Sequence, residues 1–250
     1  MKTLSKIIRS ALHQRGKADV PQIGNVSPIC PYCGNALERK PTRKRKCPEC
    51  GQTIYVKKRP SDGILVLVTA RQARQIDEQR ERLRELREWE KRRKDPEFAS
   101  IERQLRKQWG KDPSLSDVLW ALANKRLMQH ASNGDWGLYR NVKLEMAEIL
   151  RKWSRRPREA LQFYLEVFYL DLNGPVNTGG NRRVKPFDQR QAFIAPVVVR
   201  RIRRLAKKAD VTPAELRQML IRAAETVGPS GLPVGPQTCW RRLRDYMQAR

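Results

Sequence analysis

Apolar and polar positions alternate with a period of two only near the start of the chain. Residues 53–58 read TIYVKK, and residues 64–68 form a short run, ILVLV, after the turn PSDG at 60–63. Alternation predicts a half-buried strand, and a short β-branched run bounded by turn residues predicts another. We therefore expect a small sheet in this part of the chain.

After residue 69 the apolar positions follow a helical period instead. Thr69 and Gln72 have the spacing of a capping box, so a helix is predicted over 70–94, with sparse apolar positions and a nearly all-charged surface. Further helices are predicted where stretches of helical period are bounded by Pro, Gly or Asn. They cover residues 98–109, 114–130, 136–153, 159–172, 197–209 and 213–223, with a short one around Trp240. The charged 70–94 helix is interpreted as a mostly solvated spacer, and residues 176–185, VNTGGNRRVK, as a linker.

These elements predict a mainly α protein with a small N-terminal β segment, a long charged spacer helix and a helical bundle or repeat-like body. The predicted division has five segments. They are a basic N-terminal helix or arm at 1–27, the β segment at 28–68, charged spacer helices at 69–112, a helical bundle at 113–175 and a basic C-terminal helical region at 176–250.

Four of the five cysteines form two pairs of the same design. CPYCG carries Cys30 and Cys33, CPECG carries Cys47 and Cys50, and thirteen residues separate the pairs. Two thiolates two residues apart share one tight turn, and the following glycine accepts a backbone geometry that turns amides toward sulfur. Thirteen residues suffice for a hairpin that brings the pairs together. The pattern predicts one structural Zn²⁺, because four thiolates leave no position open for water.

Two other uses of these cysteines fit the sequence less well. Two disulfides would suit an exported chain, but the N-terminus lacks the apolar region of a secretory signal. A redox CxxC would need a thioredoxin-like βαβ pattern, which the sequence does not have. Cys239 stands alone and is expected to be an ordinary buried thiol.

The paired knuckles resemble the zinc-ribbon family over about residues 28–68. The resemblance implies a small three-stranded sheet carrying one zinc ion. Zinc ribbons also serve as protein-docking modules, so the family leaves nucleic acid and protein open as partners.

Two helical segments carry partial resemblances. Within 141–174, EALQFYLEVFYLDLNG is similar to the second helix of a tetratricopeptide repeat, although Leu172 stands where that repeat normally has proline. Ordinary bundle core is the interpretation we favour for its stripe of leucines and aromatics. RRIRRLAKKADVTPAELRQMLIRAA is loosely similar to the helix pair of ribbon-helix-helix repressors, but residues 191–196 are too short and interrupted for the base-reading strand.

The chain is strongly basic, with 53 Lys+Arg against 26 Asp+Glu and a net charge of +27. This excess favours a polyanionic partner, nucleic acid or an anionic membrane surface, over a small neutral substrate. No apolar run approaches the ~20 residues that a membrane helix needs. We therefore expect no membrane span and a cytoplasmic location.

Two groups of basic residues are candidate phosphate contacts. The first lies between the cysteine pairs and along the following strand, where Tyr55 could stack on a base or pack on its own sheet. Its cations are Arg39, Lys40, Arg43, Lys44, Arg45, Lys46, Lys57, Lys58 and Arg59. The second, on one face of the 197–209 helix, comprises Arg200, Arg201, Arg203, Arg204, Lys207 and Lys208. The alternative for both groups is a solvated charged face.

The sequence contains no nucleophile elbow, Walker loop or HExxH motif, and only two histidines. We expect a zinc-ribbon DNA- or RNA-binding protein without catalysis of its own, which grips phosphates through the ribbon loop and the basic C-terminal helix. Two alternatives remain: an adaptor docking on a transcription, replication or translation machine, and a nucleic-acid-processing enzyme with dispersed acidic residues.

Overall fold

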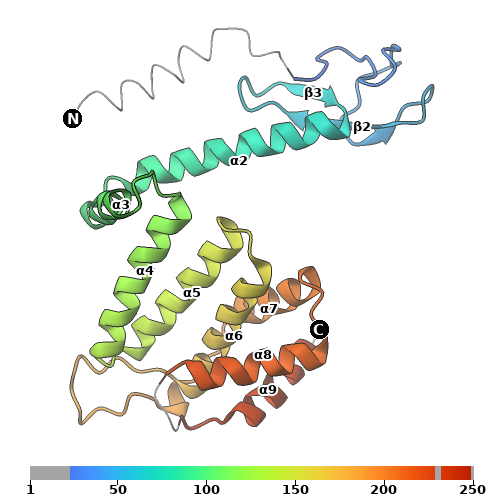
Figure 1. Ribbon diagram of the computed structural model, residues 1–250. Coiled ribbons are helices and arrows are strands. Elements are labelled where there is room, and N and C mark those ends of the chain that lie inside the picture. Colours follow the sequence, from blue (N-terminus) through green and yellow to red (C-terminus); the bar gives the residue numbers. More distant parts are fainter. Residues whose placement is uncertain (1–22, 229–231, 249–250) are drawn as a thin grey trace. The chain divides into compact units, whose positions relative to one another are not determined.

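The computed structural model describes residues 23–228 and 232–248 (Figure 1). The described chain falls into two compact units that divide between Lys91 and Arg92. Most of the predicted N-terminal helix or arm lies outside the described residues, and the five-segment division stays a prediction. Within the described part, every helix is too short or too polar to cross a bilayer.

A three-stranded antiparallel sheet opens the first unit, as predicted. Its strands are β1 (Arg45–Lys46), β2 (Thr53–Lys58) and β3 (Leu65–Val68), in the order β1-β2-β3. Val56 pairs with Leu67 across β2 and β3. An isolated bridge from Asn25 to Leu67 covers the other edge of β3. Gly24 lies so close to β3 there that a Cβ would come 2.5 Å from Val68 Cγ1.

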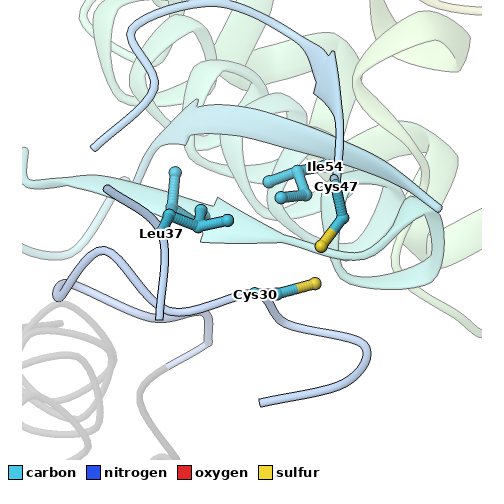
Figure 2. Packing of buried hydrophobic residues seen from close by; sticks show 5 residues of the cluster. Cys30, Leu37, Cys47 and Ile54 are labelled. Carbon is cyan, nitrogen blue, oxygen red and sulfur yellow. The ribbon is translucent and has the colours of Figure 1, made fainter. Parts of the chain in front are cut away.

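Each side of this sheet has its own small core. One contains Cys30, Leu37, Cys47, Ile54 and Leu67 (Figure 2). The other contains Val66 and Val68 together with Ala73 and Ile76, which lie in the first turns of α2 (Ala70–Arg92). The start of the expected spacer helix is therefore packed on the sheet rather than solvated.

The start of α2 is defined by the predicted capping box. Thr69 Oγ1 accepts a hydrogen bond from the Gln72 N–H at 3.2 Å, and Gln72 Oε1 accepts one from the Thr69 N–H at 2.9 Å. The helix thus begins directly after β3, and this brings Ala73 and Ile76 onto the sheet.

The second unit is helical, which confirms the mainly α prediction. It contains α3 (Pro96–Trp109), α4 (Leu115–Ser132), α5 (Trp136–Lys152), α6 (Pro157–Asn173), the 3-10 turn η1 (Gln189–Gln191), α7 (Pro196–Lys208), α8 (Pro213–Thr226) and α9 (Pro236–Gln248). Figure 1 shows α4, α5 and α6 side by side, and α6 also packs against α7, α8 and α9. Eleven of its 17 residues are buried, as expected for a helix covered on several sides.

Helix starts in this unit follow capping signals that are visible in the sequence. Ser114 forms a full capping box with Asp117, and Thr212 forms one with Glu215. Asp95 accepts from the Glu97 N–H at the start of α3. Such caps satisfy backbone donors that the first helical turn leaves unpaired, so they mark boundaries locally.

The segment interpreted as a linker, 176–185, connects α6 to the region before α7, and it is docked on the N-terminus of α5. Asn177 Oδ1 accepts a hydrogen bond from the Leu138 N–H at 2.9 Å. The Gly179 N–H donates to the Asp135 carboxylate at 2.8 Å. A Cβ on Gly137 would lie 2.9 Å from Asn177 Oδ1, so glycine is required for this approach.

Cys239 is fully buried in α9, as predicted. Burial raises the pKa of its thiol to about 12, so it stays protonated at neutral pH.

Candidate metal centre and basic surfaces

The two cysteine knuckles have the same backbone geometry. In the first, the Gly34 N–H donates to the Cys30 carbonyl at 3.0 Å, and in the second the Gly51 N–H donates to the Cys47 carbonyl at 3.0 Å. Both glycines have positive φ, +77° and +69°, with nothing near the position of a Cβ. Glycine is therefore needed here for its backbone conformation and not for space.

The four sulfur atoms converge on one point. Cys30 and Cys50 sulfurs lie 3.8 Å apart, those of Cys33 and Cys47 lie 3.9 Å apart, and all four are within 4.8 Å of one another. A tetrahedral zinc site with Zn–S bonds of about 2.3 Å has sulfur–sulfur edges of about 3.8 Å. Figure 2 shows the Cys30 and Cys47 sulfurs directed toward each other beside Leu37 and Ile54. The set fits one zinc ion.

Backbone amides support negative charge on these sulfurs. The Asn35 N–H hydrogen-bonds to Cys33, and the Gln52 N–H hydrogen-bonds to Cys50. Sequence reasoning did not single out these two donors. Their signal is positional, because each stands five residues after the first cysteine of its knuckle.

The four thiols influence one another's ionisation. The N–H groups of Cys50 and Glu49 lower the pKa of Cys47 to about 7, against the effect of burial. The pKa of Cys50 is raised to about 12, because burial and the neighbouring thiols outweigh the Gln52 N–H. One thiolate thus hinders formation of the next, and a divalent cation at the centre removes this penalty.

The disulfide alternative does not match this geometry. All five cysteines of the chain are free thiols. The 3.8 and 3.9 Å sulfur separations are nearly twice the S–S bond length of about 2.05 Å.

The loop between the knuckles, residues 39–46 (the hairpin loop), presents most of its cations to solvent. Its exposed basic residues are Arg39, Arg43, Lys44, Arg45 and Lys46, and among the described residues none of them pairs with a carboxylate. Lys40 is half-buried and donates to the Leu65 carbonyl at 2.6 Å, which ties the loop to β3.

Tyr55 and two of the three cations that follow it have local structural partners, whereas the Lys58 side chain is exposed. Tyr55 packs against the core of Val66 and Ile76, and Lys44 Nζ lies 4.9 Å from its ring centroid. Lys57 pairs with Asp77 at 2.6 Å. Arg59, expected to contact phosphate from the strand end, is buried and pairs with Asp62.

The six cations of α7 likewise divide into residues with local partners and residues that are exposed to solvent. Val198, Ile202 and Leu205 bury one face of the helix. Arg201 lies 3.8 Å from Glu148, and Arg203 donates to the carbonyls of Tyr246 and Met247 at the end of α9. The remaining cations, Arg200, Arg204, Lys207 and Lys208, are exposed.

No protein-family model, curated protein or solved structure matches this chain. What the chain does must therefore follow from its own residues. Those residues comprise a four-cysteine centre that fits zinc and two separate elements with exposed, unneutralised cations, the hairpin loop and α7.

Proposed function

We propose that this protein is a zinc-ribbon nucleic-acid-binding protein without catalysis of its own. The zinc ion holds the two knuckles together and so fixes the hairpin loop, whose cations bind the phosphate backbone of DNA or RNA. The exposed cations of α7 form a second contact. Lys and Arg that neutralise phosphates release condensed counterions, which gives most of the affinity in binding of this kind.

One observation carries this proposal: five exposed cations sit on a loop whose two ends are held by the metal centre. Like charges so close together repel, and free side chains on a flexible segment would spread apart. The knuckles prevent the backbone from spreading, so a polyanion meets a preorganised cationic surface.

The absence of catalysis is part of the proposal, and it is supported by the ion pairs of three of the four buried carboxylates among the described residues. Glu102 pairs with Arg106 at 2.9 Å, Glu166 with Lys143 at 2.8 Å, and Asp171 with Arg140 at 2.6 Å. A carboxylate held by a cation is a weaker ligand for Mg²⁺ and a weaker general base than a free one. Intact DNA and RNA after incubation with the zinc-loaded protein and Mg²⁺ is the expected result.

The test is a charge reversal in the hairpin loop. We expect the triple variant Arg39→Glu, Arg43→Glu, Arg45→Glu to bind a single-stranded oligonucleotide roughly 100-fold more weakly at low salt. The slope of log affinity against log salt should flatten by about two to three units, because about three phosphate contacts are lost. Fluorescence anisotropy over a salt series measures both quantities on zinc-loaded protein.

A matched control carries the same change of charge elsewhere in the first unit. Arg71, Arg74 and Arg82 are exposed on α2, and replacing them with Glu lowers the net charge equally. This control should lose far less affinity. Equal losses in the two triple variants, or wild-type binding that does not depend on salt, would contradict the proposal.

A further inference from the structure

A second cationic feature of the first unit lies away from the hairpin loop. The turn between β2 and β3 and the second half of α2 line a hollow of about 670 Å³. Six of its lining residues are cations, namely Lys58, Arg59, Arg80, Arg84, Arg87 and Lys91, against one carboxylate, Glu88.

The helical wall of this hollow has an unusual composition. Arg80, Arg84, Arg87 and Lys91 recur at the spacing of one helical face, and Leu83 is the one apolar residue that α2 contributes to the lining. A helical face directed at a neighbouring element is normally apolar. Here both walls carry cations. Asp62 and Asp77 pair with Arg59 and Arg80, but the lining as a whole keeps an excess of positive charge, which favours an anion in the hollow.

Arg59 supplies an independent sign of a missing ligand. Its side chain is 4% exposed, and its Nε and Nη2 donate to the Asp62 carboxylate. Its Nη1 is buried and has no hydrogen-bond acceptor in the described part of the chain. Buried donors are almost always paired, so an unpaired nitrogen on a residue that lines a cationic hollow is consistent with an acceptor that is supplied from outside.

The walls of the hollow are held in place by contacts around it. Arg80 Nη2 donates to the Lys58 carbonyl at 2.8 Å, which links α2 to the end of β2. Asp77, one turn earlier on α2, pairs with Lys57 at 2.6 Å. Ala73 and Ile76 fix the start of α2 on the sheet. Arg80 and the backbone of both walls are thus positioned before any ligand arrives, which lowers the entropic cost of binding.

We propose that this hollow binds a phosphate group. Arginine guanidinium groups match the oxygens of phosphate in paired hydrogen bonds, which favours phosphate over a monatomic anion. A volume of about 670 Å³ also exceeds what a bare ion needs and falls in the range of small-molecule pockets. The phosphate can belong to a nucleic-acid strand or to a free phosphate compound. This site does not depend on the role proposed for the hairpin loop.

The experiment compares two single charge reversals on α2 in the full-length, zinc-loaded protein. Arg87→Glu changes the lining of the hollow, and Arg82→Glu changes an exposed residue outside it. Inorganic pyrophosphate and a single-stranded oligonucleotide are titrated separately by calorimetry at low salt. Thermal unfolding with and without pyrophosphate gives a second readout, because a ligand of the folded state raises its Tm.

We expect Arg87→Glu to weaken binding about tenfold or more, and Arg82→Glu by less than about threefold, since only Arg87 offers a direct charged hydrogen bond there. A selective loss of oligonucleotide binding identifies a backbone phosphate as the ligand. A selective loss confined to pyrophosphate identifies a free phosphate compound. Equal effects of the two variants on both probes, or no binding of either probe, would show that the hollow does not bind phosphate.

The same measurements test the phosphate site and the proposed function independently of each other. If the hairpin-loop variant loses oligonucleotide binding while Arg87→Glu behaves like Arg82→Glu, the proposed phosphate site is wrong and the proposed nucleic-acid-binding function stands. If pyrophosphate binding depends on Arg87 in a protein that binds no oligonucleotide, the proposed nucleic-acid-binding function is wrong and the phosphate site in the hollow stands.

Discussion

At the scale of single residues, the surroundings of a cysteine decide its chemistry. The N–H groups of Cys50 and Glu49 lower the pKa of Cys47 to about 7, whereas burial raises the pKa of Cys239 to about 12. Metal binding requires the thiolate. Cys47 is therefore the knuckle cysteine that ionises most readily, and the sulfurs of the other three converge on the same centre, whereas Cys239 lies outside this group and is a packing residue.

We expect Cys47→Ser to abolish stoichiometric zinc binding, because three thiolates cannot close a tetrahedral structural site. Cys239→Ala is the control: it should keep one zinc per chain and lose only about 1 kcal/mol of stability through the small cavity it leaves. Metal analysis after exhaustive dialysis, with urea unfolding of each variant, measures both effects. Full zinc retention by Cys47→Ser would contradict the assigned centre.

Elements differ in how far their boundaries depend on distant residues. Ser114 and Thr212 cap α4 and α8 from adjacent positions, and these starts are readable in the sequence. The side chain of Asp135, the N-cap of α5, makes no cap hydrogen bond to its own helix. Its Leu138 N–H is capped instead by Asn177, 39 residues later. No local pattern reveals such a cap, which is why 176–185 was predicted to be a linker.

Removing the distant cap should destabilise the second unit. We expect Asn177→Ala to cost about 1 kcal/mol of unfolding free energy, the usual value of an N-terminal cap. Asn181→Ala is the comparison, because the Asn181 side chain accepts from the Arg183 N–H within its own loop. Urea unfolding followed by circular dichroism measures both losses. A loss at Asn181 as large as that at Asn177 would show that docking of the loop on α5 is unimportant.

For the whole molecule, the important fact is that each unit has its own core. Cys30 and Cys47 are part of a core of the first unit, so the metal centre and hydrophobic packing there depend on each other. The second unit packs around α6 without any of the four metal-binding cysteines. Loss of metal should therefore affect the two units differently.

We expect a zinc chelator to remove hydrogen-exchange protection from residues 23–68 while residues 92–248 keep theirs, because zinc-dependent modules of this size unfold without metal. Exchange detected by mass spectrometry resolves the two regions. Protection in the first unit should return when zinc is added back. Simultaneous loss of protection in both regions would show that the units do not fold independently.

The sequence by itself determined the metal donors, the sheet, the capped helix starts and the two basic groups. These depend on periodicity, capping and the CPxCG spacing, which act over a few residues. Only the tertiary structure decided which cations remain available. Lys57, Arg59 and Arg203 are used by Asp77, Asp62 and the carbonyls of α9, whereas the second half of α2 lines a cationic hollow. Burial and pairing arise from contacts between distant segments, so charge along the chain does not reveal them.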